Sequence, residues 1–304
     1  MADKKSRYER ARSFSRKPLS EQAHIARELG GRNVRHALKR SIDRVLPFAS
    51  LPRRIEGGAW WLSANDYVGD AIYEGSFERR ERAFVERFLQ PGMVMVDVGA
   101  HHGLYSVIAA TRVGPSGVVV SFEPSERERK RLAFHRRINR LSQIKIEPLA
   151  IGKEPGEATL YIPSLKNSGF NSLRPSEEMR SAAVPVVVEV TTIDDYLARS
   201  PIGRVDLVKL DIEGGELNAL KGATETLAAY KPVILCEVED ERTLPWGYRA
   251  EEIIDLLQGK GYRWFVPQPG GRLLPSTARG SEPGTNLVAI TADRDAAELM
   301  ARSK

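Results

Sequence analysis

The chain is poor in cysteine and contains no long apolar segment. Its 304 residues include a single cysteine, Cys236, which excludes an internal disulfide and gives no reason to expect an oxidising compartment. No stretch approaches the roughly 20 apolar residues that are needed to span a bilayer. The charged opening MADKKSRYERARSFSRKP is not followed by the apolar core of a secretory signal. We therefore expect a cytoplasmic protein.

Positive charge is concentrated at the N-terminal end. The sequence carries 46 Lys and Arg against 40 Asp and Glu, a net charge of +6. Residues 1–54 hold 15 basic and 5 acidic residues, which leaves 31 basic and 35 acidic residues, a net charge of −4, in the other 250. Because the body of the protein is mildly acidic, the overall charge does not indicate that it binds nucleic acid.

The first 56 residues are expected to form a basic extension that is partly disordered and partly helical. Apolar spacing predicts helices over residues 20–30 and 33–46, and the second helix is both basic and amphipathic. Such a helix either packs on the body or contacts an anionic membrane surface or an acidic partner, so residues 1–54 are candidates for peripheral membrane contact. Proline and glycine near its end predict a boundary, followed by a main domain over 57–295 and a tail over 296–304.

From residue 78 onward, predicted strands alternate with predicted helices. Apolar runs of strand length lie at 93–98, 118–124, 144–151, 205–212, 232–238, 262–267 and 286–291. Helical patterns occupy 78–89, 104–113, 127–141, 192–200, 215–230 and 251–261. Two further strands, at 157–162 and 186–190, predict an inserted hairpin over about 157–190. The alternation predicts an α/β fold with a doubly wound, mostly parallel sheet, in which ligands bind at the carboxyl ends of the strands.

The segment DVGAHHG, which starts at Asp97, joins the first of these strands to a helix. Gly99 and Gly103 allow the backbone to approach a ligand closely, and the N-terminus of the helix offers N–H groups to it. Glu123 ends the next strand about twenty residues later, where its carboxylate can accept both ribose hydroxyls of an adenosine, and the small-residue bend at Ala150 suits an adenine edge. The third glycine of the dinucleotide motif is missing, and Asp97 suits an amino and sulfonium group better than a pyrophosphate. We therefore favour S-adenosylmethionine over a nicotinamide dinucleotide.

These motifs, in this order, resemble the FkbM family of S-adenosylmethionine-dependent methyltransferases. The resemblance covers about residues 75–291 and rests on GSFE, PGMVMVDVGAHHGLYS, SFEPSE, EPLAIG, TIDDYL, VDLVKLDIEGGELNALKGA, KPVILCEV and NLVAI. The most specific piece is KLDIEGGE followed by LKGA. The resemblance implies a class I methyltransferase fold, Rossmann-like with a seven-stranded sheet, and O-methylation of a hydroxyl on a sugar, glycolipid or natural product. It covers no part of residues 1–56.

One departure from the family falls in the cofactor loop, where His101 stands in place of a common asparagine. Both side chains form local hydrogen bonds and tolerate unusual backbone angles, so the exchange need not damage the cofactor site. It could, however, alter the affinity for the cofactor or add a titrating group. The residues expected to bind S-adenosylmethionine are Glu78, Asp97, Gly99, Ala100, His101, Gly103, Tyr105, Glu123, Pro124, Ala150 and Asp211.

Methylation of a hydroxyl requires a group that removes the hydroxyl proton. Asp211 and Glu213 follow the fourth strand, and their spacing places both on one face if the strand continues. Lys209 shares that face and could pair with Asp211. Alternatively, one carboxylate only caps the following helix. His102 is a further candidate because the unperturbed pKa of histidine is about 6.5, although such a histidine is more often a hydrogen-bonding spacer. The catalytic candidates are therefore Asp211, Glu213 and His102.

The acceptor is expected to contact Glu237, which ends the fifth strand, and Asn171 and Ser172 in the inserted hairpin. Glu237 could instead pair with Lys209, and Glu78 could be a carboxylate that favours a helix start. The acceptor itself, a small molecule, a glycan or a lipid, is not specified by the sequence.

No bound metal is expected. Asp211, Glu213, Glu237 and His102 could hold a divalent ion if they converge, but no closely spaced ligand motif supports one.

Two other functions remain open. The chain could be a non-enzymatic module that binds a membrane or a protein through its basic extension, although Asp97, Gly99, Glu123 and Asp211 are all intact. It could also methylate RNA, although it lacks the aromatic motif of amino-nitrogen methylases and its basic extension has no interleaved stacking aromatics. Nucleic acid is therefore not the expected partner.

Overall fold

The computed structural model describes residues 52–62, 67–277 and 286–292. The helices predicted over 20–30 and 33–46 and the tail over 296–304 lie outside these residues. So do all but the last three residues of the segment 1–54, for which contact with a membrane or an acidic partner is predicted. None of the described helices combines the length and the apolarity needed to cross a bilayer.

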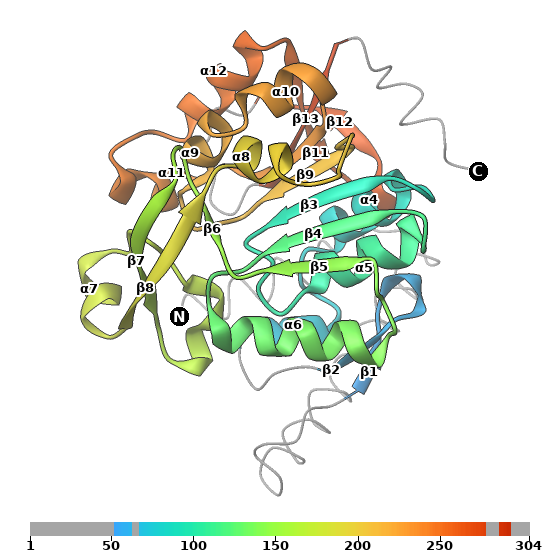
Figure 1. The fold of residues 1–304 in the computed structure, drawn as a ribbon, viewed down its shortest axis with the longest axis horizontal. Helices are drawn as coiled ribbons and strands as arrows, with labels where there is room; N and C mark the ends of the chain where they lie inside the picture. The colour runs from blue at the N-terminus through green and yellow to red at the C-terminus, as the bar shows by residue number, and fades with distance from the viewer. Residues whose placement is uncertain (1–51, 63–66, 278–285, 293–304) are drawn as a thin grey trace, which may run out of the picture.

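Five parallel strands form one side of an eight-stranded sheet, up to its edge at β5 (Figure 1). They lie in the order β5 (Ile144–Glu147), β4 (Val118–Phe122), β3 (Val94–Val98), β9 (Leu207–Leu210) and β10 (Val233–Glu237). They are nearly continuous apolar runs because both faces of a parallel sheet are covered. The chain moves outward from β3 to β5, then returns beside β3 to form β9 and moves outward on the other side. The predicted doubly wound, mostly parallel α/β fold is confirmed.

Three antiparallel strands complete one edge of this sheet. They are β13 (Asn286–Thr291), β11 (Tyr262–Pro267) and β12 (Leu273–Pro275). The seven expected strands are all present, but the sheet has eight strands rather than seven. The additional strand is β12, which follows the turn η4 (Pro269–Gly271) and pairs back onto β11.

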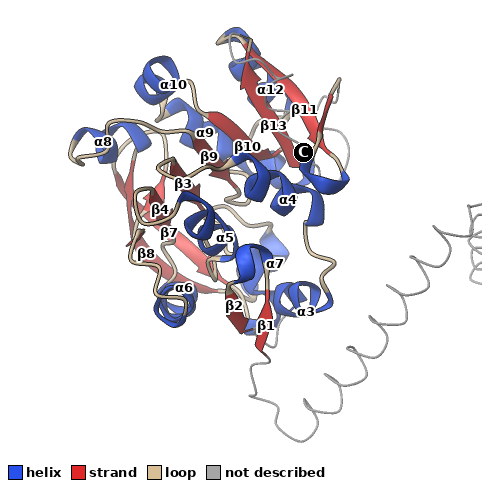
Figure 2. Cartoon of the chain, turned by 90° about the vertical axis from the view of Figure 1, so that its right-hand side faces the viewer, coloured by secondary structure: helices blue, strands red, loops and turns tan. Residues whose placement is uncertain are grey.

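Helices cover both faces of the sheet (Figures 1 and 2). Because side chains alternate along a strand, Met95 packs into one core while Val94, Val96 and Val98 pack into the other. The first core includes residues of α4 (Arg79–Phe88), α5 (Leu104–Val113) and α6 (Glu126–Ile138). The second core includes residues of α8 (Ile193–Ala198), α9 (Glu216–Lys221), α10 (Thr224–Tyr230) and α12 (Glu251–Gly259).

A second, three-stranded sheet follows β5 in the chain. Its order is β6 (Ala150–Ile151), β8 (Val184–Thr191) and β7 (Gly156–Ile162), and β7 and β8 pair as an antiparallel hairpin. The segment between them contains η2 (Leu165–Phe170) and α7 (Glu177–Ser181). This segment returns to β7 through a bridge between Tyr161 and Ser172.

The remaining elements precede α4 or follow β10 in the chain. The hairpin of β1 (Pro52–Arg54) and β2 (Trp60–Leu62), which encloses η1 (Glu56–Gly58), is followed by α3 (Tyr67–Glu74). On the other side, α11 (Asp240–Thr243) and η3 (Leu244–Trp246) follow β10.

Two predicted elements are each divided in the structure. The strand predicted over 144–151 ends at Glu147, and β6 belongs to the second sheet; Pro148 separates the two pieces and has no N–H for a sheet hydrogen bond. The helix predicted over 215–230 divides into α9 and α10 at Gly222, where a Cβ would lie 2.3 Å from the Gly152 carbonyl oxygen.

Candidate active site

A pocket opens at the carboxyl ends of β3, β4, β9 and β10, where the strand order reverses. Most of the predicted site residues line it: Glu78, Gly99, Ala100, His101, His102, Tyr105, Glu123, Pro124, Ala150, Asn171, Asp211, Glu213 and Glu237. The other three predicted residues, Asp97, Gly103 and Ser172, are not among the lining residues.

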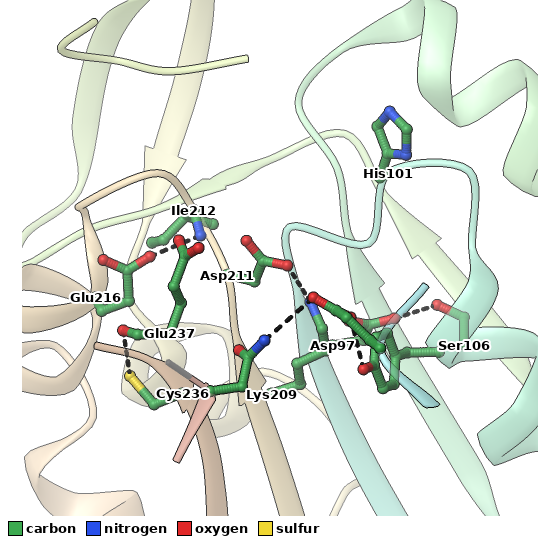
Figure 3. A network of polar contacts seen from close by, with 12 residues as sticks. Asp97, His101, Ser106, Lys209, Asp211, Ile212, Glu216, Cys236 and Glu237 are labelled. Atoms are coloured by element: carbon green, nitrogen blue, oxygen red, sulfur yellow. Dashed lines mark hydrogen bonds and ion pairs between the residues drawn. The ribbon is translucent and has the colours of Figure 1, made fainter. Parts of the chain in front are cut away.

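Asp97 lies at the end of β3, behind the pocket wall. It is fully buried, and Ser106 in α5 donates a hydrogen bond of 2.5 Å to its Oδ2 (Figure 3). Its Oδ1 has no hydrogen-bond partner among the described residues. Burial raises the pKa of Asp97, and the nearby ammonium group of Lys209 opposes that rise. Asp97 therefore fastens the strand end to the helix that follows the cofactor loop.

The cofactor loop turns sharply because three of its residues have positive φ. These are Gly99 at 79°, His101 at 50° and Gly103 at 86°. A Cβ on Gly99 would lie 1.9 Å from the backbone oxygen of Asp211, so the loop packs directly against the end of β9. Histidine and asparagine occupy the left-handed region more readily than most residues. The angle at His101 is therefore consistent with its expected replacement of an asparagine.

Glu123 closes the loop from the end of β4. Its two carboxylate oxygens accept hydrogen bonds from the backbone N–H groups of His101, at 2.8 Å, and Ser125, at 2.9 Å. The side chain is buried but lines the pocket, and burial raises the pKa of Glu123 to about 7. Because each carboxylate oxygen has further acceptor capacity, Glu123 can still accept hydroxyl groups from a ligand.

The two histidines of the loop stack on each other, with ring centroids 3.8 Å apart. His102 is buried, and burial lowers the pKa of its ring well below the ordinary value. Both rings group with Glu128, and Figure 3 shows His101 well apart from Asp211. His102 is therefore not grouped with Asp211, Glu213 and Glu237 in the structure. The metal site of four residues that the sequence suggested is wrong in including His102.

Glu78 connects three elements at the pocket wall. It precedes α4 without a side-chain capping bond. The Tyr105 hydroxyl donates to its Oε2 at 2.7 Å, and the Asn286 amide donates to its Oε1 at 3.1 Å. Burial, followed by the charge of Asp211, raises the pKa of Glu78 to about 7. These contacts differ from those of a carboxylate that only favours a helix start.

Asp211, Glu213 and Glu237 converge at the ends of β9 and β10, with one oxygen of each within 4.8 Å of the other two. Lys209 pairs with Asp211 at 2.9 Å, as predicted, and the Arg242 Nε lies 3.2 Å from Glu213. The Glu237 Oε2 is buried and has no hydrogen-bond partner among the described residues. Burial raises the pKa of Glu213 to about 8, and burial together with neighbouring carboxylates raises the pKa of Glu237 well above its ordinary value.

The backbone that carries these carboxylates is held from several sides. Neither Asp211 nor Glu213 caps α9, whose N-cap is Gly215 without a side-chain bond. Instead, the Glu216 carboxylate accepts hydrogen bonds from the N–H groups of Ile212, at 2.8 Å, and Gly214, at 3.4 Å. The strand does not continue past Leu210, and Glu213 reaches the pocket from a turn in which its φ is 55°.

The inserted segment supplies the opposite wall of the pocket. The Asn171 side chain lines it, and neither of its polar atoms has a hydrogen-bond partner among the described residues. Ser172 instead donates to the Glu213 carbonyl oxygen at 3.3 Å, so it contacts the turn rather than the pocket. Apolar side chains from the inserted segment, α3, the residue pair before α4 and η3 also line the pocket: Val68, Ile72, Phe77, Leu160, Phe170, Leu173 and Trp246.

Some pocket residues were not identified from the sequence. Trp61 lines the pocket from β2, and Arg242 and Trp246 line it from the segment after β10. Two further residues do not line the pocket but hold residues that do. Asn286 donates a hydrogen bond to Glu78, and Glu216 accepts one from the backbone of the turn after β9. Glu216 and Asn286 belong to the motifs DIEGGE and NLVAI. Both motifs are part of the resemblance to the family, but the sequence analysis assigned no role to these two side chains. For the other three, no local pattern distinguishes a pocket residue from a core residue.

Comparison with known proteins identifies the family. The model of the methyltransferase FkbM domain matches residues 97–264, more than half of the chain. The AMB antimetabolite synthetase AmbE of Pseudomonas aeruginosa is 26% identical over 252 residues, which are 72% of this chain and 11% of that protein. Methyltransferase 1 of Beauveria bassiana is 24% identical over 143 residues, 42% of this chain and 57% of that protein. The chain thus spans less than two thirds of both relatives.

A further relative and two solved structures are also similar. Methyltransferase sdnD of Sordaria araneosa is 28% identical over 196 residues, 55% of this chain and 73% of that protein. The crystal structure of methyltransferase FkbM from Methylobacillus flagellatus is 17% identical, with a TM-score of 0.42, and the match covers 75% of this chain and 56% of that one. The SAM-dependent methyltransferase from Aquifex aeolicus is 15% identical, with a TM-score of 0.38, over 69% of this chain and 87% of that one. The family match, which includes the cofactor loop and both carboxylate-bearing strand ends, establishes that the chain belongs to the FkbM methyltransferase domain family.

Proposed function

We propose that this protein is an O-methyltransferase that uses S-adenosylmethionine to methylate a hydroxyl on a sugar, glycolipid or natural-product acceptor. The observation that carries the proposal is that one pocket contains both a glycine-containing cofactor loop edged by Glu123 and the converging carboxylates of Asp211, Glu213 and Glu237. The first feature suits the cofactor, and the second suits a hydroxyl that must lose a proton.

The acceptor groups and the apolar surface of the pocket fit S-adenosylmethionine. Leu149 and Ala150, with Pro124, give an apolar surface for a flat adenine ring, and Glu123 offers carboxylate oxygens to the two ribose hydroxyls. Glu78 offers a carboxylate to the ammonium group of the methionine part. When bound, the cofactor supplies a methyl group on a positively charged sulfur, and this methyl bonds to the acceptor oxygen as its bond to sulfur breaks.

The residues of the chain then orient the acceptor and remove its proton. The ion pair with Lys209 engages Oδ2 of Asp211, which leaves Oδ1 to accept the proton from the hydroxyl. Glu213 and Glu237 border the same space and hold the hydroxyl in place. The amide of Asn171 can both donate to and accept from further polar groups of the acceptor, because its polar atoms are not engaged by the described protein. The apolar wall excludes water from the reacting atoms.

The proposal is tested by separating binding from transfer. Purified protein is incubated with methyl-labelled S-adenosylmethionine and extracted glycans, lipids and small metabolites, and the labelled product is isolated. We expect Glu123→Ala to weaken cofactor affinity, measured by calorimetry, because it removes the acceptor of the ribose hydroxyls. We expect Asp211→Ala mainly to reduce turnover, by about 100-fold or more, since a positioned base contributes at least that factor.

Two outcomes would contradict these assignments. Equal cofactor affinity in wild type and Glu123→Ala would remove Glu123 from the cofactor site. Absence of S-adenosylmethionine binding to the wild-type protein would exclude an enzymatic role and favour a non-enzymatic binding module.

A further inference from the structure

We propose that Asp211, Glu213 and Glu237 bind one divalent cation of the class that prefers oxygen ligands, Mg²⁺ or Mn²⁺. From the sequence, these residues could hold an ion only if they converge, because they come from two strand ends and have no closely spaced ligand motif. The inference concerns the same pocket, and its role in catalysis rests on the function proposed above.

The geometry of the three carboxylates suits a single ion. One oxygen of each lies within 4.8 Å of one oxygen of each of the others. Two oxygens bound to one Mg²⁺ at about 2.1 Å lie no farther apart than about 4.2 Å. The three carboxylates are therefore close enough for rotation of their side chains to bring one oxygen of each onto a single ion.

The cations already present leave oxygens free for an ion. Lys209 engages Oδ2 of Asp211, and Arg242 lies beside Oε2 of Glu213, so each residue retains a second oxygen. Glu237 has no ion pair among the described residues, and its Oε2 is buried without a hydrogen-bond partner. A buried carboxylate oxygen without a donor is costly, and an ion at this point would remove that cost. Figure 3 shows Asp211 and Glu237 reaching the same region from neighbouring strands.

The local charge also favours a cation. Glu216 lies directly behind the group, is 1% exposed, and has an unpartnered Oε2 of its own. These four carboxylates lie around two cationic side chains, Lys209 and Arg242, and Glu239 also lies beside Arg242. Carboxylates therefore outnumber cationic side chains here, which favours the binding of a cation. The chemistry of the ligands, three carboxylates without sulfur or imidazole, indicates Mg²⁺ or Mn²⁺ rather than zinc or copper.

The turn that carries Glu213 is built as a rigid support. Trp246 donates its indole N–H to the Glu213 carbonyl oxygen at 3.0 Å, and Tyr248 donates its hydroxyl to the Gly214 carbonyl oxygen at 2.6 Å. A Cβ on Gly214 would lie 2.0 Å from the Arg242 carbonyl oxygen, so the turn is packed against the segment after β10. Hydrogen bonds behind the ligands commonly orient them for a metal.

A second group, His101, His102 and Glu128, also has ligand atoms close together, but it is a poorer site. Its carboxylate is already engaged, because the Ser125 hydroxyl donates to one oxygen and the Arg127 guanidinium to the other, at 2.6 Å for Arg127. The two imidazole rings are stacked, so their in-plane lone pairs run side by side rather than toward one point. A variant of Glu128 can therefore show whether an ion binds at this second group instead of at Asp211, Glu213 and Glu237.

The positive charge of the ion would affect the hydroxyl of the acceptor. An ion held by these three residues can bind the acceptor oxygen and lower the proton affinity of the hydroxyl. The proton still passes to Oδ1 of Asp211, because that oxygen has two lone pairs and the ion takes only one of them. The ion would favour hydroxyl acceptors with a second oxygen nearby, such as vicinal diols, which can bind the ion through both oxygens.

The test measures binding of Mn²⁺ alone to the full chain, by loss of the electron paramagnetic resonance signal of the free ion and by calorimetry. We expect one site in the wild type, and affinity reduced by about tenfold or more in both Glu237→Gln and Asp211→Asn, as losses of metal-site contacts commonly produce. The matched control is Glu239→Gln, which removes a carboxylate charge 3.9 Å from Arg242 but no ligand. It should bind Mn²⁺ within a few-fold of the wild type.

Three results would overturn the proposal: no Mn²⁺ binding to the wild type at millimolar concentration, unchanged binding in Glu237→Gln, or selective loss of binding in Glu128→Gln. Thermal unfolding of each variant verifies that it folds. Binding of S-adenosylhomocysteine is measured on the same samples, so that failure of the metal site is distinguished from failure of the cofactor site. A protein that binds the cofactor without Mn²⁺ would retain the proposed methyltransferase function and lose only the metal.

Discussion

Backbone strain in the described residues is concentrated at the pocket. Five non-glycine residues have positive φ, and three of them, Glu78, His101 and Glu213, line it. The left-handed conformation costs an ordinary residue roughly 1–2 kcal/mol, so these positions persist because their surroundings determine them. Each of the three carries a polar side chain that lines the pocket, and strained residues commonly cluster at functional sites.

The angle at His101 leads to a prediction about stability. His101→Asn and His101→Val both remove the ring that stacks on His102, but only asparagine tolerates the left-handed region. We expect His101→Val to be less stable than His101→Asn by about 1–2 kcal/mol, and to bind S-adenosylhomocysteine more weakly. The asparagine variant should keep cofactor affinity within a few-fold of the wild type. Chemical denaturation and calorimetry measure both quantities, and equal stability of the two variants would show that backbone strain does not select this residue.

At the scale of elements, one buried histidine of α6 connects the β1–β2 hairpin to the cofactor loop. His135 is fully buried, its Nδ1 lies 2.8 Å from the His102 carbonyl oxygen, and its Nε2 lies 3.2 Å from the Leu62 backbone nitrogen. Its ring stacks on Trp61, with centroids 3.8 Å apart. A neutral ring with the proton on Nδ1 donates to His102 and accepts from Leu62. The hairpin and the loop are thus held by one side chain.

His135 should therefore make stability depend on pH. Burial lowers its pKa from 6.5 to about 4, and Arg131 contributes a smaller effect in the same direction. Between these values the unfolded chain binds the proton and the folded protein does not. The contribution of His135 is thus present above pH 6.5 and is lost as the pH falls toward 4, at up to about 1.4 kcal/mol per pH unit.

The matched variant is His135→Phe, which keeps the stacked ring but loses both hydrogen bonds. We expect it to be less stable than the wild type by about 1–3 kcal/mol at pH 7, because buried backbone groups lose their partners. This difference should shrink as the pH is lowered toward 5. Guanidinium denaturation at both pH values measures it, and a difference independent of pH would contradict the assigned protonation of His135.

The predicted helix over 215–230 shows why some elements could not be placed from the sequence. Helical periodicity continues across Gly222, but Asp194 of α8 accepts hydrogen bonds from the N–H groups of Glu225 and Thr226 and so begins a new helix there. That contact joins residues about thirty positions apart. The local sequence pattern contains no information about this contact. By contrast, Thr192 caps α8 by accepting from the Asp195 N–H at 2.9 Å, which is a contact between residues three positions apart.

At the scale of the whole molecule, the sheet and the strand-end residues were predictable for the same reason. Apolar runs define the parallel strands, and polar residues directly after them must meet at one edge, as Glu123, Asp211 and Glu237 do. Trp61 and Arg242 reach the pocket from segments outside that pattern. Their positions depend on how the hairpin and α11 pack, which is decided by long-range contacts such as Trp61 with His135.

These contacts predict where the functional domain begins. Arg53 donates to the Ile72 carbonyl oxygen at 2.7 Å, and the Trp60 N–H donates to Asn139 at 2.6 Å, so the hairpin is fastened to α3 and α6. Trp61 is 1% exposed and forms part of the pocket wall. Deletion of residues 1–51 should therefore leave the Tm and the affinity for S-adenosylhomocysteine close to those of the full chain. Deletion of residues 1–62 should lower stability by several kcal/mol, since loss of one buried tryptophan side chain alone costs about 3–5 kcal/mol. It should also weaken cofactor binding, because His135 would lose its contacts with the hairpin and hold the cofactor loop less firmly.

Thermal unfolding and calorimetry on the two truncations measure these effects. If the shorter deletion alone abolished cofactor binding, part of the binding site would have to lie in residues 1–51, and the domain would begin before the hairpin.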